Sequence, residues 1–192
     1  MPVDRVEFAL ENLKGKILDA GYSVGGIHEK FMEKFGAENV YGVDIETEND
    51  TEHYRRSSAE KMPFESGFFD SIFAGELIEH IYTPELFLRE ANRVLKKAGV
   101  MIITTPNQKS LVNRLFKSYQ TRIHVSLFDA ESLKKALNEA GFEVRDFYCQ
   151  PYSGENCYGS RNKWSFALRN FVHRFLPQNL QEQMIVKAVK VK

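Results

Sequence analysis

Two glutamates and two histidines stand at spacings that could bring them together for proton transfer or metal binding. Glu76, Glu79 and His80 occupy positions i, i+3 and i+4, so a helix beginning near Glu76 would place all three on one side. His124 follows a long loop, from which it could reach the same cleft. Such a set of oxygen and nitrogen ligands suits a divalent ion that acidifies a hydroxyl group, whereas either histidine alone could serve as a general base. The structural alternative is that Glu76 lies at a helix N-terminus, where negative charge is favoured without any ligand.

A glycine-rich turn after the first apolar run is the second candidate site. Residues 19–26 read Asp-Ala-Gly-Tyr-Ser-Val-Gly-Gly and precede a stretch with helical spacing. Asp44 ends the next apolar run about 20 residues later, the distance at which a carboxylate meets ribose hydroxyls. A dinucleotide site would need Gly-x-Gly-x-x-Gly, and here Ser23 replaces the middle glycine. Asp19 would repel a pyrophosphate and attract an ammonium group, so an adenosine ligand other than a dinucleotide is favoured over a mere tight turn.

Short apolar runs alternate with helical patterns along most of the chain, which is typical of a mostly parallel sheet covered on both faces. In such sheets ligands bind beyond the carboxyl ends of the strands, where both candidate sites fall. Strands are expected at residues 16–20, 40–44, 54–58, 69–74, 99–105, 142–149 and 183–191. Helices are expected at residues 24–35, 84–97 and 129–140, with Asp129 as the N-cap of the last and Gly141 as the glycine that ends it.

The composition places the chain among ordinary globular domains. Its 192 residues are enough for one domain; 43% are apolar and 27% charged, and 26 basic residues balance 26 acidic ones. The zero formal charge argues against a protein that coats nucleic acid. Cys149 and Cys157 are too few for a disulfide framework or a four-cysteine zinc site. Without a signal sequence or an apolar run of about 18 residues, we expect a soluble, cytoplasmic protein.

The glycine-rich turn resembles the first motif of the class I S-adenosylmethionine-dependent methyltransferases, Asp-x-Gly-x-Gly-x-Gly. Asp19, Gly21 and Gly25 match it, and Ser23 departs from it. The resemblance implies that the turn, with Tyr22, binds S-adenosyl-L-methionine: Gly21 lets the methionine part pass close to the backbone, and Asp19 orders the loop or the amino group. It also implies that Asp44 binds the ribose hydroxyls with Ile45 beside the adenine.

Further segments resemble later motifs of this family, so the resemblance covers about residues 16–144. Residues 58–64 and 67–70 are similar to its Asp-Ala-Glu-x-Leu-Pro-Phe … Phe-Asp segment, which implies that Ser58 and the Ala59 amide contact the adenine. Ser58 replaces an aspartate and weakens one expected hydrogen bond. Residues 74–80, which include Gly75 and Glu76, also match and imply further cofactor contacts. The resemblance implies one doubly wound, Rossmann-like α/β domain over residues 1–192, with seven strands and an antiparallel last strand.

The carboxylates and histidines also resemble a metal site found in two subfamilies. Glu76, Glu79, His80 and His124 are similar to the magnesium or zinc ligands of small-RNA 2′-O-methyltransferases and quinone-precursor phenol O-methyltransferases. Other family members carry Glu-His pairs without a metal. We therefore predict no resident metal, keep these four residues as candidate ligands, and take His80 and His124 as the candidate catalytic bases.

The segment from 150 to 182 is additional to the minimal fold and is expected to be a helical, lid-like insertion before the last strand. One helical face and a set of cationic side chains support this: Trp164, Leu168, Phe171 and Phe175, then Arg161, Lys163, Arg169, His173 and Arg174. The insertion could dock on the sheet edge, cover the acceptor site, or lie on a membrane interface for a lipid-linked acceptor. The roughly 15 residues before the first strand leave no room for the N-terminal helical cap of many small-molecule members.

We thus expect methyl transfer from S-adenosyl-L-methionine to an oxygen or nitrogen of a small molecule or glycan. The sequence lacks the Asn/Asp-Pro-Pro-aromatic motif that methyltransferases of bases and glutamine amides often carry; its place reads Ala74-Gly75-Glu76-Leu77. Three alternatives remain: a metal-dependent RNA 2′-O-methyltransferase, a non-catalytic cofactor-binding protein in which Ser23 and Ser58 mark decay, and a nicotinamide oxidoreductase. The acceptor and the oligomeric state are not predicted.

Overall fold

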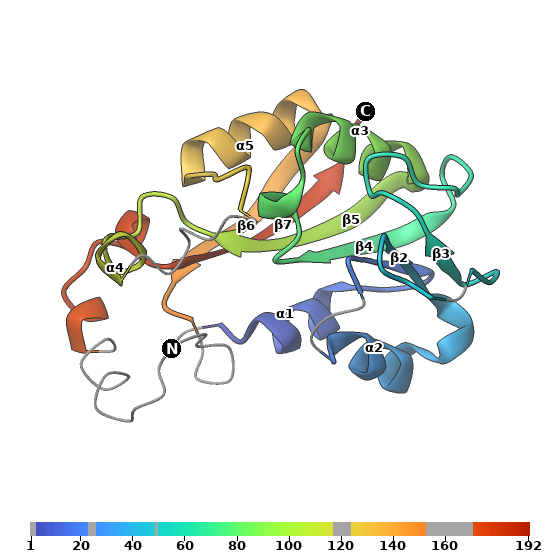
Figure 1. Ribbon diagram of the computed structural model, residues 1–192, viewed down its shortest axis with the longest axis horizontal. Helices are drawn as coiled ribbons and strands as arrows, with labels where there is room; N and C mark the ends of the chain where they lie inside the picture. Colours follow the sequence, from blue (N-terminus) through green and yellow to red (C-terminus); the bar gives the residue numbers. More distant parts are fainter. Residues whose placement is uncertain (1–2, 23–25, 49, 117–123, 153–170) are drawn as a thin grey trace.

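A seven-stranded sheet forms the centre of the protein, with helices on both of its faces (Figure 1). The structure is a computed structural model that describes residues 3–22, 26–48, 50–116, 124–152 and 171–192. The strand order is β3-β2-β1-β4-β5-β7-β6. The strands are β1 (Ile17–Ala20), β2 (Val40–Asp44), β3 (Tyr54–Arg56), β4 (Phe69–Gly75), β5 (Leu95–Pro106), β6 (Phe142–Gln150) and β7 (Gln183–Lys190).

The first five strands are parallel, and β7 runs antiparallel to both of its neighbours, β5 and β6. The predicted doubly wound sheet with an antiparallel last strand is therefore confirmed. Because β7 is reversed, it begins at the edge where β4, β5 and β6 end: Thr104 is opposite Ile185, and Gln150 is opposite Gln183. Side chains from all four strands can therefore meet at one edge of the sheet.

Helices α1 and α2 lie on one face of the sheet, and α3 and α5 on the other (Figure 1). Each face has its own apolar core: Phe8 and Phe31 contribute to the first, Phe87 and Leu137 to the second. The helices are α1 (Arg5–Asn12), α2 (Ile27–Phe35), α3 (Pro84–Val94), α4 (Leu111–Phe116) and α5 (Ala130–Glu139), with short 3-10 turns η1 (Ala37–Asn39), η2 (Ile78–His80) and η4 (Gln178–Leu180).

Helix α3 ends earlier, and β5 begins earlier, than the sequence pattern predicts. The apolar stripe suggested a helix to residue 97, but α3 ends at Val94 and β5 starts at Leu95. Leu95 is fully buried opposite Phe69, after which a bulge shifts the register until Ser71 pairs with Val100. Pairing with a distant strand thus overrides the local helical spacing.

The first 15 residues contain a helix that the sequence analysis did not predict. In α1, the Asp4 carboxylate accepts hydrogen bonds from the backbone N–H groups of Val6 and Glu7, and Phe8 and Ala9 are buried. Phe8 packs edge-on against Tyr148 of β6, with ring centroids 5.5 Å apart. Although α1 is only eight residues long, it covers part of one face of the sheet.

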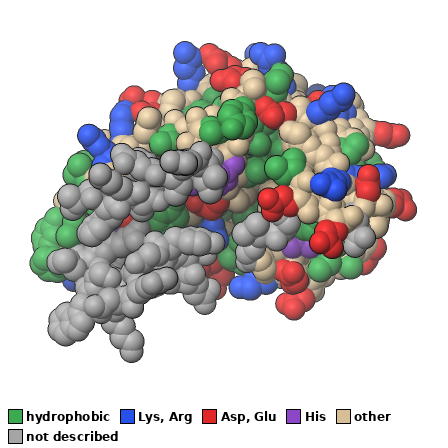
Figure 2. Space-filling view, viewed as in Figure 1, with side chains coloured by type: hydrophobic (Ala, Val, Ile, Leu, Met, Phe, Trp, Pro, Cys, Tyr) green, Lys and Arg blue, Asp and Glu red, His purple; other side chains and the backbone are tan. Residues whose placement is uncertain are grey.

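Most of the predicted insertion lies outside the described residues, among them Trp164, Leu168 and Cys157. Phe171 and Phe175 are described: they are 57% and 73% exposed, and their rings are paired with centroids 5.2 Å apart. Among the described residues, no helix is long and apolar enough to cross a membrane. Acidic and basic side chains are interspersed over the coloured part of the face in Figure 2, in keeping with the zero formal charge.

The predicted N-cap of α5 is confirmed and gives a pH-dependent expectation. The Asp129 carboxylate accepts from the Glu131 and Ser132 N–H groups, and these bonds, with Lys109 beside it, lower the pKa of Asp129 to about 2. Asp129→Ala should reduce the unfolding free energy by about 1 kcal/mol at pH 7. Because the folded pKa lies below the unfolded one, the stabilisation is present above about pH 4 and is lost as the pH falls through about 2.

Urea titrations of the wild type and Asp129→Ala from pH 7 down to pH 2 would measure this difference. Asp50→Ala, which removes an exposed carboxylate outside any helix cap, serves as the control and should cost less. A stability difference that does not shrink with acid would show that the charge of Asp129 contributes nothing to the cap.

Candidate active site

The carboxyl ends of β1, β2, β4 and β5 lie side by side and carry most of the predicted site residues. Ala20 pairs with Val43 on one side and Ala74 on the other, and Gly75 pairs with Thr104. The edge therefore has two halves: a predicted cofactor half at β1 and β2, and a half at β4 and β5 that holds the carboxylates and histidines.

Asp19, at the first of these strand ends, bonds to a histidine that the sequence analysis missed. Its Oδ2 lies 3.0 Å from Nδ1 of His28, in the first turn of α2, and both side chains are buried. Burial raises the pKa of Asp19, and the hydrogen bond from His28 opposes that rise. Of the two expected roles of Asp19, this contact favours ordering of the loop, because it joins the chain before the turn to the helix after it.

Gly21 adopts a left-handed backbone conformation that favours glycine. Its φ is 79°, its N–H donates to the Val43 carbonyl at 2.8 Å, and an added Cβ would lie 3.0 Å from the side chain of Leu77. Only a glycine fits here without strain. Gly25, the other matching glycine, and Ser23 lie outside the described residues.

The predicted ribose and adenine residues come together at the end of β2. The Asp44 carboxylate accepts from the N–H of Glu46 at 2.8 Å, while Ile45 is 66% exposed. The N–H of Ser57 donates to the Asp44 carbonyl, which brings Ser58 next to this strand end. The structure thus brings together three predicted cofactor residues that are 14 positions apart at most in the sequence.

Ser58 forms a local turn at the position where the motif has aspartate. Its Oγ accepts from the N–H of Glu60 at 3.1 Å and lies 3.3 Å from the Glu60 carboxylate. The neighbouring Ala59 is buried. The serine therefore keeps the turn that an aspartate would make, without its negative charge.

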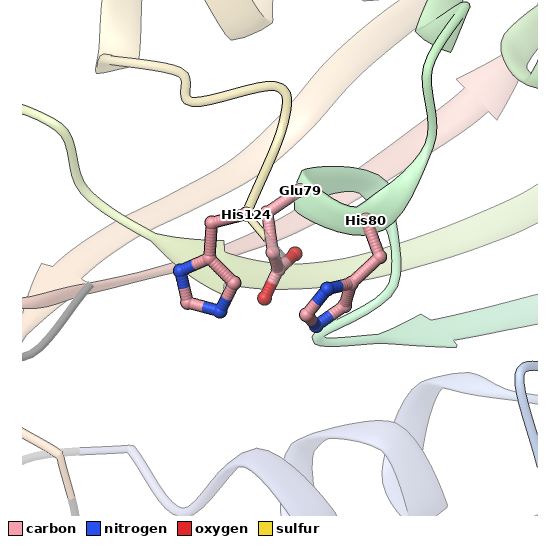
Figure 3. A group of neighbouring side chains, drawn as sticks. All are labelled: Glu79, His80 and His124. Atoms are coloured by element: carbon pink, nitrogen blue, oxygen red, sulfur yellow. The ribbon is translucent and has the colours of Figure 1, made fainter. Parts of the chain in front are cut away.

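Glu79, His80 and His124 form a compact cluster, and Figure 3 shows their side chains converging from η2 and from the loop that carries His124. One ligand atom from each residue lies within 4.8 Å of the others, and the histidine ring centroids are 4.8 Å apart. The Glu79 carbonyl accepts from the N–H groups of Val125 and Ser126, at 2.8 and 3.1 Å, which fixes the loop carrying His124 against η2. The predicted meeting of His124 with the earlier residues is thus observed.

Glu79 is the buried member of the cluster. It is 1% exposed, and its Oε2 accepts from the Thr105 hydroxyl at 2.9 Å. Burial, followed by the nearby Glu76 carboxylate, raises the pKa of Glu79 well above its usual range. A carboxyl in this environment readily carries a proton, and a cation beside it would favour the ionised form.

Glu76 does not join this cluster, which corrects the prediction of one helical face. It directly follows β4 with a φ of 52°, and the 3-10 turn η2 starts two residues later, so no helix aligns Glu76 with His80. Its Oε1 accepts from Thr104 and Gln183, both at 2.9 Å. The strand end therefore points this carboxylate toward β5 and β7.

Two further side chains complete the surroundings of Glu76. The Tyr152 hydroxyl donates to Oε2 at 3.3 Å, and an Arg5 nitrogen lies 3.6 Å from Oε1. Burial and the Glu76 carboxylate raise the pKa of Tyr152 well above its usual range, so this phenol keeps its proton. Arg5, Tyr152 and Gln183 were not predicted, because each belongs to a different, distant segment and no local motif marks it.

Replacement of Glu76 should therefore be costly for folding. Glu76→Ala would leave Thr104, Gln183 and Arg5 without this acceptor in a largely buried region, at a cost of about 2–3 kcal/mol. Glu65→Ala, which removes an exposed carboxylate from the loop before β4, is the control and should cost about 0.5 kcal/mol or less. Urea unfolding of both variants measures the loss of unfolding free energy. Equal losses would mean that the hydrogen bonds of Glu76 do not stabilise the fold.

The comparisons with known proteins agree with this architecture. A family model described as a methyltransferase domain matches residues 2–146. The chain belongs to this family. The predicted class I methyltransferase fold is thereby confirmed, and S-adenosyl-L-methionine is confirmed as the cofactor at the level of the family.

Two curated relatives are longer than this methyltransferase domain. A ubiquinone biosynthesis O-methyltransferase of Bartonella bacilliformis is 33% identical over 75% of the chain and 58% of its own length. A sarcosine/dimethylglycine N-methyltransferase of Halorhodospira halochloris is 25% identical over 74% of the chain and 57% of its own length. The chain thus spans little more than half of each.

A solved structure of an S-adenosylmethionine-dependent methyltransferase from Archaeoglobus fulgidus has the same fold. It superimposes with a TM-score of 0.70 over 97% of this chain and 91% of its own, at 19% identity. This likeness extends beyond the family model into β6 and β7, and it supports the fold alone.

Proposed function

We propose that the protein transfers a methyl group from S-adenosyl-L-methionine to a hydroxyl oxygen of a small molecule. The observation that carries this proposal is the cluster of Glu79, His80 and His124, one strand away from the predicted cofactor half of the site. The name of the Bartonella relative, an O-methyltransferase, supports oxygen over nitrogen as the acceptor atom.

The chemistry requires little more than positioning and removal of one proton. The hydroxyl oxygen forms a bond to the methyl carbon as the carbon–sulfur bond breaks, and the electron pair returns to sulfur to give S-adenosylhomocysteine. The hydroxyl proton goes to an imidazole nitrogen of His80 or His124. In-line approach is set by the parallel strand ends, which hold the two halves of the site side by side.

The cluster is also able to hold a divalent cation. One buried carboxylate oxygen and two imidazole nitrogens within 4.8 Å are a suitable donor set, and Glu79 gains from a nearby positive charge. Bound there, such an ion would acidify the acceptor hydroxyl. Glu76, predicted as a fourth candidate ligand, is held by Thr104 and Gln183 instead.

The proposal is tested by assaying methyl transfer from labelled S-adenosylmethionine to a catechol, a simple sugar, a primary amine and a short RNA duplex. Each acceptor is assayed with added Mg²⁺ or Zn²⁺ and with a chelator. Methylation of the catechol or sugar, but not of the amine, supports oxygen transfer to a small molecule. Methylation of RNA alone, or cofactor binding without turnover on any acceptor, contradicts it.

A further inference from the structure

A network of polar and aromatic side chains links the glycine-rich turn to the chain that follows Asp44. His28, already bonded to Asp19, has its other ring nitrogen 3.3 Å from the Tyr54 hydroxyl. Tyr22 packs against both rings, with centroids 4.8 Å from His28 and 5.3 Å from Tyr54, and its hydroxyl shares a hydrogen bond with Thr47. The network therefore joins β1, the turn, α2, the chain after β2, and β3.

Tyr22 is fixed in this network by the shape of β2. Its ring lies over Gly42, where any Cβ would overlap it. With β2 beneath the ring and His28 and Tyr54 against it, the phenol has little freedom. Its hydroxyl is consequently held at one place, next to the residues that follow Asp44.

Thr47 is the other end of the link. It is 5% exposed, whereas Ile45 and Glu46 beside it are exposed. In the described part of residues 45–53 there is no helix, so that no packed element steadies the chain after β2. Three contacts hold residues 45–48: the hydrogen bond between Tyr22 and Thr47, the Asp44–Glu46 bond, and a 3.3 Å hydrogen bond from Arg56 to the Ile45 carbonyl. Of these, only the bond to Tyr22 links the stretch to the glycine-rich turn.

We propose that Tyr22 and Thr47 are positioning residues that set the distance between the Gly21 backbone and the Asp44 carboxylate. The inference rests on the proposed function, in which those two groups hold opposite ends of one cofactor. A ligand that spans both ends gains affinity when their separation is already correct, because no conformational freedom is lost on binding. Tyr22, predicted to bind the cofactor, thus acts through Thr47.

The test compares Tyr22→Phe, Thr47→Val and the double variant by titration with S-adenosylhomocysteine and with adenosine. Each single change should raise the dissociation constant for S-adenosylhomocysteine about fivefold, and the double change no further, because both remove one bond. Affinity for adenosine, which reaches only the Asp44 half, should change by less than twofold. Amide exchange at residues 45–48 of the unliganded protein should accelerate in all three variants.

Tyr148→Phe, a tyrosine of β6 far from this network, is the matched control and should leave both affinities and the exchange unchanged. Unchanged S-adenosylhomocysteine affinity in Tyr22→Phe and Thr47→Val overturns the inference while leaving the proposed function intact. Equal losses for both ligands also overturn it, since they indicate a direct contact or general destabilisation. If the wild type binds no S-adenosylhomocysteine, the proposed function fails, and the inference fails with it even if amide exchange responds.

Discussion

Replacing Asp44 by alanine is expected to raise the dissociation constant for S-adenosylhomocysteine about a hundredfold. The predicted contact is a pair of hydrogen bonds from ribose hydroxyls to an ionised carboxylate, and losing it costs about 2.7 kcal/mol. Asp44 lies at the end of β2, with the exposed Ile45 on one side and the Ser58 turn hydrogen-bonded to its backbone through Ser57. Calorimetric titration of the purified proteins measures the loss.

Two further variants separate binding from folding in this experiment. Asp44→Asn keeps an acceptor for the Glu46 N–H but removes the charge, and should weaken binding about tenfold. Asp50→Ala, an exposed carboxylate on the same connection, should bind like the wild type. If Asp44→Ala keeps full affinity, the cofactor does not use the end of β2, and the assignment of Asp44, Ile45 and Ser58 is wrong.

Replacing His124 or His80 by alanine is expected to slow methyl transfer about a thousandfold while affinity for S-adenosylhomocysteine changes less than twofold. Removing a group that accepts the acceptor's proton typically costs two to four orders of magnitude. The two imidazoles pack edge to face with centroids 4.8 Å apart, beside the Glu79 carboxylate and on the half of the site away from Asp44. Single-turnover rates at saturating cofactor give the chemical step directly.

His53→Gln is the matched control, because His53 stacks on Tyr41 beside β3 and lies outside the cluster. It should transfer the methyl group at the wild-type rate. If only one of the two cluster variants is slow, that histidine alone accepts the proton. If both are as fast as the wild type, the cluster has a structural role, and the proposed oxygen transfer loses its main support.

Some features of this fold are determined by neighbouring residues, and others by residues far away in the sequence. The strand ends, the α5 cap and the turn at Gly21 follow from local features: apolar runs, an Asp129 that satisfies free N–H groups, and a φ of 79° that favours glycine. The same local spacing misplaced the end of α3, because Leu95 is held by its pairing with Phe69. Local patterns predict an element's end correctly where nearby backbone groups determine it, and fail where pairing with a distant strand determines it.

The sequence alone was enough to predict the family and the meeting of His80 with His124, which are observed, and the cofactor half of the site, which stays a prediction. These follow from motifs in the connections that begin at strand ends, because parallel strands bring their carboxyl ends to one edge whatever the intervening sequence. Only the tertiary structure decided the partners of Glu76, His28 and Tyr22. Their contacts come from residues as far away as Gln183, and such pairings depend on how the reversed last strand and the helices pack, which no local spacing encodes.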